Sequence, residues 1–197
     1  MKSTCTAVTL GLAVAVGSSV AFAGDQTIKT PGDHPHYAIE VEPHGLFGFG
    51  ALNSWGGFGF GAGLRLSIPI VQNGFVKQIN NSVAITFGGD FLHYESCYYA
   101  VYGCGANYLY FPVAMQWNFF VAKSWSVFPE IGVAPYYGFF DNYCDTLNPN
   151  LRGYCSSPSH FSVTPWFNVG GRYHFNEHVA LTMRVGWPTI SVGVSFM

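Results

Sequence analysis

The chain has 197 residues and a formal net charge of −2 at pH 7, with 9% charged and 18% aromatic residues. Charged residues are far fewer than the roughly 25% of an average soluble domain. The nearly neutral charge also argues against a nucleic-acid partner, because binding to phosphates needs clustered Lys and Arg side chains.

The amino terminus has the pattern of a secretory signal peptide. Lys2 precedes an apolar, small-residue stretch at residues 7–20, and the cleavage motif Ala21-Phe22-Ala23 follows it. The stretch contains glycines and serines and is shorter than the roughly 20 apolar residues of a membrane helix. We therefore expect residues 1–23 to be removed on export.

Residues 24–36 are polar and carry two prolines, so we expect a short unpaired segment before the first strand. Asp33, His34 and His36 in this segment are candidate metal ligands. Because the segment is expected to be solvated, we predict neither a metal site nor a cofactor there.

The segment Phe58–Val71 shows the pattern that dominates the mature chain. Its even-numbered residues are all apolar, whereas the odd-numbered ones include Gly, Ser, Pro and Arg65. Side chains alternate along a strand, so one face is expected to contact lipid while Arg65 points to the opposite side.

The same alternation predicts eight strands, with lengths near the roughly 9–11 residues of a tilted membrane-spanning strand. In chain order they cover residues 37–47, 58–71, 82–94, 107–120, 125–139, 161–175, 179–187 and 189–197. Lipid cannot satisfy open strand edges. The predicted fold is therefore all-β, a closed antiparallel up-and-down transmembrane barrel that occupies residues 37–197.

An even number of strands places both ends of the barrel domain on one side, where membrane barrels have their short periplasmic turns. The two longest connections, Glu95–Ala106 and Phe140–His160, then fall on the external side.

These two connections carry the four cysteines of the mature chain, Cys97, Cys104, Cys144 and Cys155. In an exported protein these predict disulfides, and we favour the pairs within each loop. Zinc is the alternative, although the spacings are not those of structural zinc sites.

The final segment, Ser191 to Met197, alternates and carries Phe196 near its end. With the eight predicted strands, it resembles the eight-stranded outer-membrane β-barrels of Gram-negative bacteria, the group that includes OmpX, OmpW and the OmpA membrane domain. The resemblance implies a location in the bacterial outer membrane, contact with its lipid and folding by the barrel assembly machinery. We expect a monomer.

The inward parity of the predicted strands collects most of the charged residues. They form a predicted lumen charge network of Glu40, Glu42, Arg65, Asp90, Glu130, Arg172 and Arg184. An eight-stranded barrel has room only for its own side chains or one small ligand, so we expect ion pairs to plug the lumen. A narrow pore or a small-solute carrier is the alternative.

An enzyme is a third reading, because His160-Phe161-Ser162 resembles the His-x-Ser pair of outer-membrane lipid A deacylases. Those enzymes need an acidic partner a little further along the chain, but the first acidic residue here is Glu177, which the topology places at the opposite end of the barrel. Their active site also faces the lipid, whereas His160 and Ser162 have the inward parity. We therefore predict no enzymatic activity.

Aromatic residues are frequent around the two external loops. We expect those nearest the strands to form an interfacial girdle. Within the loops, Tyr98, Tyr99, Tyr102 and Tyr143 are candidates for a surface that binds an extracellular ligand or partner. A soluble lipocalin-like barrel is the remaining alternative, but it would leave too few charges on the outer surface.

Overall fold

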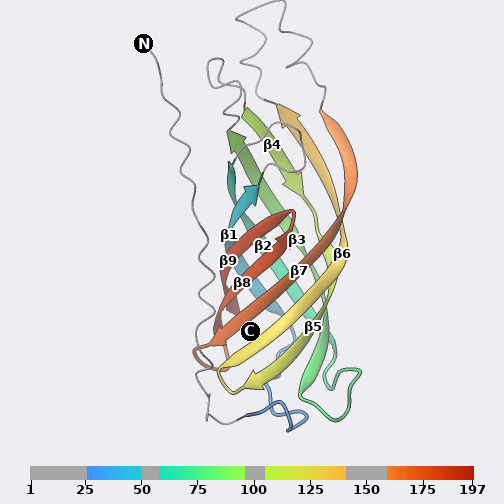
Figure 1. The fold of residues 1–197 in the computed structure, drawn as a ribbon, viewed down its shortest axis with the longest axis vertical. Helices are drawn as coiled ribbons and strands as arrows, with labels where there is room; N and C mark the ends of the chain where they lie inside the picture. Colours follow the sequence, from blue (N-terminus) through green and yellow to red (C-terminus); the bar gives the residue numbers. More distant parts are fainter. Residues whose placement is uncertain (1–25, 50–57, 96–104, 141–158) are drawn as a thin grey trace, which may run out of the picture.

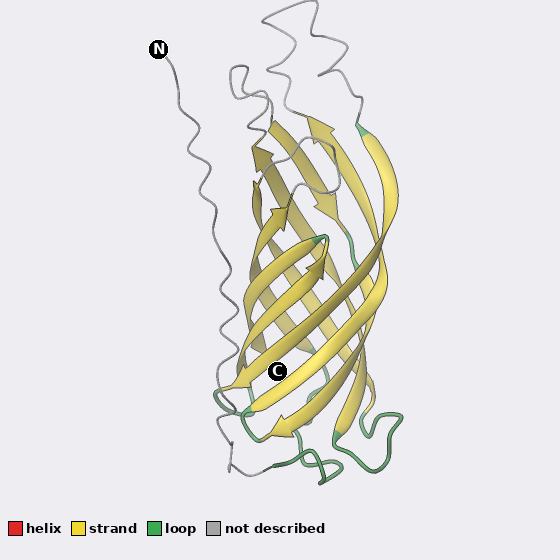
Figure 2. Cartoon of the chain, viewed as in Figure 1, coloured by secondary structure: helices red, strands yellow, loops and turns green. Residues whose placement is uncertain are grey.

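The computed structural model describes residues 26–49, 58–95, 105–140 and 159–197, which contain nine strands and no helix (Figure 2). The strands are β1 (Glu40–Phe49), β2 (Phe58–Val71), β3 (Asn81–Glu95), β4 (Gly105–Tyr110), β5 (Val113–Ala122), β6 (Trp125–Phe140), β7 (His160–His174), β8 (Val179–Trp187) and β9 (Thr189–Phe196).

The strands close into an antiparallel barrel. β1 pairs with β2 on one side and with β9 on the other, so the first and last strands seal the sheet. β4 and β5 both lie between β3 and β6, and they form the two halves of one barrel strand. The nine segments therefore make an eight-stranded barrel, which confirms the fold predicted from the sequence.

The break between β4 and β5 lies at Phe111 and Pro112, within the stretch predicted as a continuous strand. Pro112 has no N–H, so this strand cannot make its full set of ladder bonds there. The neighbours still bond across the break, since the Phe111 N–H donates to the Pro135 carbonyl at 2.8 Å and the Gly88 N–H donates to the Pro112 carbonyl at 3.2 Å. The barrel wall is therefore continuous although the strand is not.

Figure 1 shows that β1 begins and β9 finishes at the same end of the barrel. We call it the terminal end; it also carries the β2–β3, β5–β6 and β7–β8 connections. At the opposite end, called the loop end, β1, β3 and β6 finish and β2, β4 and β7 begin. On the topology of membrane barrels, the terminal end is the periplasmic one.

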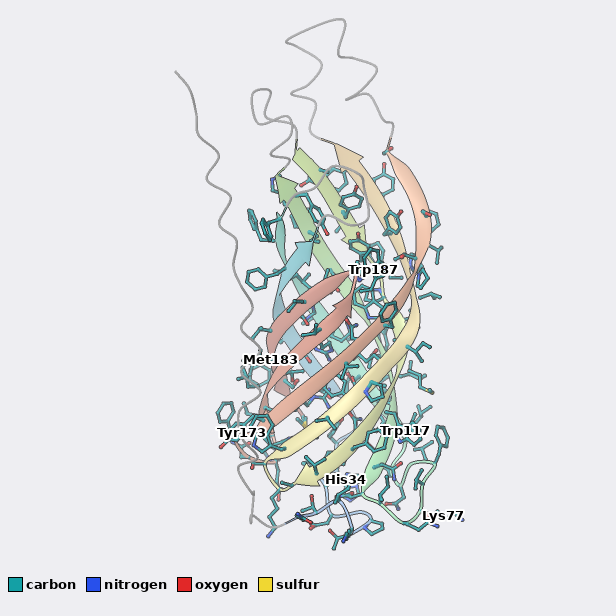
Figure 3. All side chains as sticks on the ribbon, viewed as in Figure 1. His34, Lys77, Trp117, Tyr173, Met183 and Trp187 are labelled. Atoms are coloured by element: carbon teal, nitrogen blue, oxygen red, sulfur yellow. The ribbon has the colours of Figure 1, made fainter. Side chains whose placement is uncertain are left out.

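The barrel wall separates apolar from charged side chains. The outer face exposes apolar residues along its whole height, including Ile131 at 66%, Val169 at 66% and Met183 at 51% (Figure 3). Every described Asp, Glu, Lys or Arg side chain on the strands is buried. No helix among the described residues is long and apolar enough to cross a membrane.

One outward residue departs from the predicted lipid exposure. Val83 lies on the outward parity of β3 yet is fully buried. The β2–β3 connection runs over the outer wall here, where Asn81 donates to the Val76 carbonyl at 2.7 Å and accepts from Trp117 Nε1 at 2.8 Å. Phe75 packs edge-on against Trp117 at 5.6 Å. The β2–β3 connection thus forms a small cover on the barrel wall.

The two sides of the barrel differ in height. β8 and β9 are short and turn at residues 187–189, below the tip of β7 (Figure 1). β7 pairs with β6 from His160 onward, but its pairing with β8 begins only at Phe167. Residues 160–166 therefore have a strand partner on one side only among the described strands.

Candidate functional site: the lumen and its two ends

An ion-pair chain crosses the middle of the lumen. Asp90 on β3 accepts from Arg65 on β2 at 2.9 Å, and Arg65 lies 3.7 Å from Glu130 on β6. Glu130 in turn accepts from Arg184 on β8 at 3.0 Å, and Arg184 also pairs with Glu42 on β1. Because five strands contribute to one chain of contacts, the network ties opposite walls together.

A second ion pair lies beside this chain. Arg172 on β7 contacts Glu40 on β1 at 2.6 Å and donates to Asn118 at 3.2 Å. The Tyr37 hydroxyl donates to Glu40 at 3.2 Å, and burial, assisted by the Glu40 charge, raises the pKa of this phenol.

The ion-pair chain and the second ion pair together form the charged layer of the lumen, which also contains Phe128 and His44. The guanidinium groups of Arg172 and Arg184 lie 4.7 Å and 5.1 Å from the centre of the Phe128 ring, at cation–π distance. His44 Nε2 lies 3.0 Å from Asp90 Oδ1. The layer holds four carboxylates and three guanidinium groups, and all seven side chains are at least 98% buried.

Above the charged layer, toward the loop end, the lumen is aromatic. We define the aromatic cluster as Tyr94, Tyr108, Tyr110, Tyr136 and Trp166. Its rings form a continuous series, with centroid separations of 5.6 Å for Tyr94–Tyr108, 5.3 Å for Tyr110–Tyr136 and 6.5 Å for Tyr110–Trp166. Leu46 and Leu92 belong to the same buried group. The lumen therefore has a charged middle and an aromatic loop-end half.

The aromatic cluster corrects the sequence-based expectation for its tyrosines. Residues next to the external loops were expected in a membrane girdle, but Tyr94, Tyr108 and Tyr110 are buried inside the barrel. Tyr94 has the parity of Asp90 within its strand, and Tyr108 and Tyr110 have the parity of the inward Gln116 within the predicted strand 107–120, so strand alternation already indicated that these rings point inward. Nearness to a loop was the wrong criterion, because a ring at the loop end lies in the lumen or in the lipid according to its parity.

The terminal end is covered by residues 26–39; residues up to 36 were expected to be unpaired, and residues 37–39 were expected to begin the first strand, which starts only at Glu40. Thr27 Oγ1 donates to the Phe120 carbonyl at 3.2 Å, and Asn80 donates through its side chain to the Asp33 carbonyl at 2.7 Å. The His34 ring stacks on Phe120 with centroids 4.5 Å apart. Figure 3 shows His34 beneath the strands. This segment is thus folded against the barrel mouth.

A pocket of about 630 Å³ lies between this segment and the β5–β6 and β7–β8 turns. Its lining includes Asp33, His34, His36, His174 and Glu177. These residue types suit transition metals. No group of three or more His, Cys, Asp or Glu side chains among the described residues has an arrangement that could hold a metal ion.

Ser126 and His174 meet at this end with the spacing of a nucleophile and its base. The Ser126 hydroxyl lies 2.9 Å from His174 Nε2. Ser126 is fully buried and does not line the pocket, and His174 Nδ1 has no hydrogen-bond partner among the described residues. A catalytic Ser–His pair needs an accessible hydroxyl and a third group that orients the imidazole. In the described part of the chain, the Ser126–His174 pair shows neither of these two features.

Several predicted site residues lie outside the described part of the chain. They are the four cysteines, Cys97, Cys104, Cys144 and Cys155, and the loop tyrosines, Tyr98, Tyr99, Tyr102 and Tyr143. Of the His160-Phe161-Ser162 motif, the structure places the backbone at the start of β7, and Phe161 points outward at 68% exposure.

The outer apolar surface, the closed sheet and the charged interior together decide the fold type. The chain has the fold of an eight-stranded membrane barrel. No protein-family model matches it, and no curated protein does.

Among solved structures, the chain is similar to Ail, the attachment invasion locus protein of Yersinia pestis, in complex with the heparin analogue sucrose octasulfate. The identity is 11%, the TM-score is 0.45, and the match covers 80% of this chain and 95% of Ail. Neisserial surface protein A matches at 12% identity and a TM-score of 0.45, over 80% of this chain and 94% of that one. The outer membrane protein Ail in a phospholipid bilayer nanodisc matches at 12% identity and a TM-score of 0.43, with 80% and 97% covered.

Proposed function

We propose that this protein is an outer-membrane barrel that binds a partner at the cell surface and does not act as a pore. The observation that carries the proposal is the edge of β7 at residues 160–166, above the β8–β9 turn, which has no partner among the described strands on its β8 side. We refer to it as the free edge of β7. Seven strand residues span roughly 20 Å. An unpaired strand edge is a template for an added strand.

The interior supports a scaffold in place of a pore. The ion-pair chain joins β3, β2, β6, β8 and β1 across the lumen, and residues 26–39 cover the terminal end. An eight-stranded barrel has little space beyond its side chains. Conduction would require these contacts to break, which leaves charges buried without partners.

The side chains of the loop end indicate the chemistry of the partner. Phe161 and Val163 on the outward side of the free edge are 68% and 53% exposed. In sequence, the connections 50–57, 96–104 and 141–158 hold only three charged residues, Asp141, Asp145 and Arg152. A polyanion, such as the sulfated compound bound by Ail, could pair with only one arginine in these connections, Arg152. We therefore expect an extended protein segment and no sulfated sugar.

The test uses the purified barrel in nanodiscs and a fluorescent peptide of alternating Thr and Val as a strand-forming probe. We expect saturable binding that Val163→Lys lowers several-fold, because an edge charge blocks strand addition. The matched control is Val133→Lys, which adds the same charge on β6, a strand with neighbours on both sides. Equal binding by wild type and both variants would rule out the β7 edge as the site.

The cysteine pairs belong to the same proposal, since stapled loops would present a rigid surface. We expect the four mature cysteines to react with an alkylating reagent only after reduction, as a mass measurement would record. Alkylation of the unreduced, unfolded protein would exclude both disulfides.

A further inference from the structure

The charged layer of the lumen is one cation short of electrical balance. Its four carboxylates and three guanidinium groups sum to a net charge of −1, and all seven side chains are buried. A buried charge without compensation is costly, because the interior solvates it far less well than water does. The layer therefore has a place for one more positive charge.

His44 on β1 lies in this layer with a side chain that is only 1% exposed. Its Nε2 lies 3.0 Å from Asp90 Oδ1 on β3, and its Nδ1 lies 3.1 Å from the backbone carbonyl oxygen of Glu42. The Glu42 carboxylate lies 3.8 Å from the same Nδ1. Both ring nitrogens therefore face oxygen atoms that accept hydrogen bonds.

A neutral imidazole cannot satisfy both of these contacts. It has one N–H donor and one nitrogen lone pair. The Glu42 carbonyl can only accept, so Nδ1 must carry a proton. A bare Nε2 would then direct its lone pair at a carboxylate oxygen of Asp90. The contact at 3.0 Å therefore needs a second proton, between Nε2 and Oδ1.

Arg65 indicates on which side this proton lies. Arg65 Nη2 donates to the other oxygen of Asp90 at 2.9 Å, and a guanidinium donor stabilises the anionic carboxylate. The proton then belongs to the His44 ring. Among the described residues, the charged groups within ion-pair distance of this ring are the carboxylates of Glu42 and Asp90. Their own guanidinium partners are those of Arg184 and Arg65.

The strands on either side of β1 leave room for the ring and add no charge beside it. His44 lies opposite Gly63 on β2 and opposite Gly193 on β9. A Cβ atom at Gly63 would lie 2.6 Å from His44 Nε2, and one at Gly193 would lie 2.6 Å from the His44 Cβ. The imidazole is therefore closely enclosed between the wall and Asp90.

We propose that His44 carries a proton on both ring nitrogens at neutral pH and is the fourth cation of the lumen. Above about pH 7 an exposed imidazole is mostly neutral, so the folded barrel binds one proton more than the unfolded chain does. Linkage then requires the folded state to lose stability as the pH rises. The charged layer is thus a pH-sensitive element of the fold, and it is independent of the surface role proposed above.

The first test observes the ring nitrogens directly. The barrel is labelled with ¹⁵N-histidine, folded in nanodiscs and studied by NMR, and the His44 signals are assigned by their loss in His44→Gln. We expect both His44 nitrogens to be protonated at about pH 8. A bare Nε2 at this pH would overturn the proposal, because the layer would then hold its extra proton elsewhere or not at all.

The second test compares stability across pH by urea titration in lipid vesicles. From about pH 7 to 9, we expect the folding equilibrium constant of wild type to fall by up to tenfold per pH unit relative to that of His44→Gln, the dependence of one bound proton. His178→Gln removes an exposed histidine before β8 and should keep the wild-type pH dependence. Equal pH dependence in wild type and His44→Gln would overturn the proposal.

A second variant covers the case in which His44→Gln does not fold, which heat-dependent gel mobility would reveal. Asp90→Asn removes the carboxylate that the imidazolium balances, so the layer becomes neutral without the extra proton. We expect this variant also to lose the alkaline pH dependence of wild type. Asp90→Asn with the pH dependence of wild type would likewise overturn the proposal.

Discussion

At the scale of single residues, the interior is organised by parity and by charge. All the strand-borne charges that the structure describes point inward, where each guanidinium meets at least one carboxylate. On the outer face each of the arginines would cost about 2–4 kcal/mol at the bilayer midplane, and each carboxylate somewhat less. The face of the barrel wall on which a charged side chain lies therefore decides whether it stabilises this protein or opposes insertion of the barrel into the membrane.

Arg184 is the residue whose loss should be most costly. Arg184 forms ion pairs with both Glu42 and Glu130, so Arg184→Gln would remove the cation that these two buried carboxylates share. We expect the free energy of unfolding to fall by about 3–5 kcal/mol, measured by urea titration in lipid vesicles. Lys77→Gln, which removes an exposed cation at the β2–β3 connection, is the control. A loss no greater than that of the control would show that the network contributes little.

Two adjacent glycines on β3 provide a matched pair. A Cβ atom at Gly88 would overlap with the Leu64 carbonyl oxygen, whereas at Gly89 nothing lies within 4 Å. We expect Gly88→Ala to destabilise the barrel by about 1–3 kcal/mol and Gly89→Ala to stay within about 0.5 kcal/mol. The same urea titration measures both, and equal effects would contradict the close approach at Gly88.

At the scale of elements, the connections do more than join strands. Residues 26–39 lie across the terminal end, and the β2–β3 connection both covers Val83 and holds this segment through Asn80. Asn80 also donates its backbone N–H to the Ile28 carbonyl at 2.8 Å. The two connections thus support each other.

Asn80→Ala should release part of the terminal segment while leaving the barrel folded. It removes the side-chain bond to the Asp33 carbonyl and keeps the backbone bond to Ile28. We expect trypsin to cleave after Lys29, which is exposed, several-fold faster than in wild type. Gln78→Ala, a substitution at an exposed position in the same connection, should leave the rate unchanged. An unchanged rate in Asn80→Ala would mean that Thr27 and His34 hold the segment by themselves.

At the scale of the whole molecule, closure and filling act together. The β1–β9 pairing joins the first and last strands, so the described sheet is closed below the level of the β8–β9 turn, and the lumen is crossed by ion pairs. We expect the unboiled protein to migrate differently from the boiled one on a denaturing gel, because a closed barrel resists detergent until heated. Identical mobility would contradict a stable barrel.

The filled lumen also predicts electrical behaviour. In a planar lipid bilayer the wild-type protein should give no steady current, because passage requires the Arg65, Arg172 and Arg184 contacts to break. A stable unitary current that changes in Arg65→Gln would establish the pore function in place of the scaffold.

Alternation alone determined much of this protein. It predicts the strands, their inward and outward faces and the closed barrel, because a period of two is a local property and lipid admits only closed sheets. Asp90, Glu130 and Arg184 could be assigned to the lumen for the same reason. The tyrosines of the aromatic cluster carried the same signal, although their nearness to the loops obscured it.

Only the tertiary structure decided which charges meet, how residues 26–39 cover the terminal end and where β7 lacks a second partner among the described strands. Arg184 and Glu42 are far apart in sequence and come together through the β1–β9 seam and the tilt of the strands. Pairing in the lumen depends on the registers of all the strands at once, and no local pattern encodes these registers. The aromatic cluster became visible for the same reason, since β3, β4 and β7 bring Tyr94, Tyr110 and Trp166 to one place.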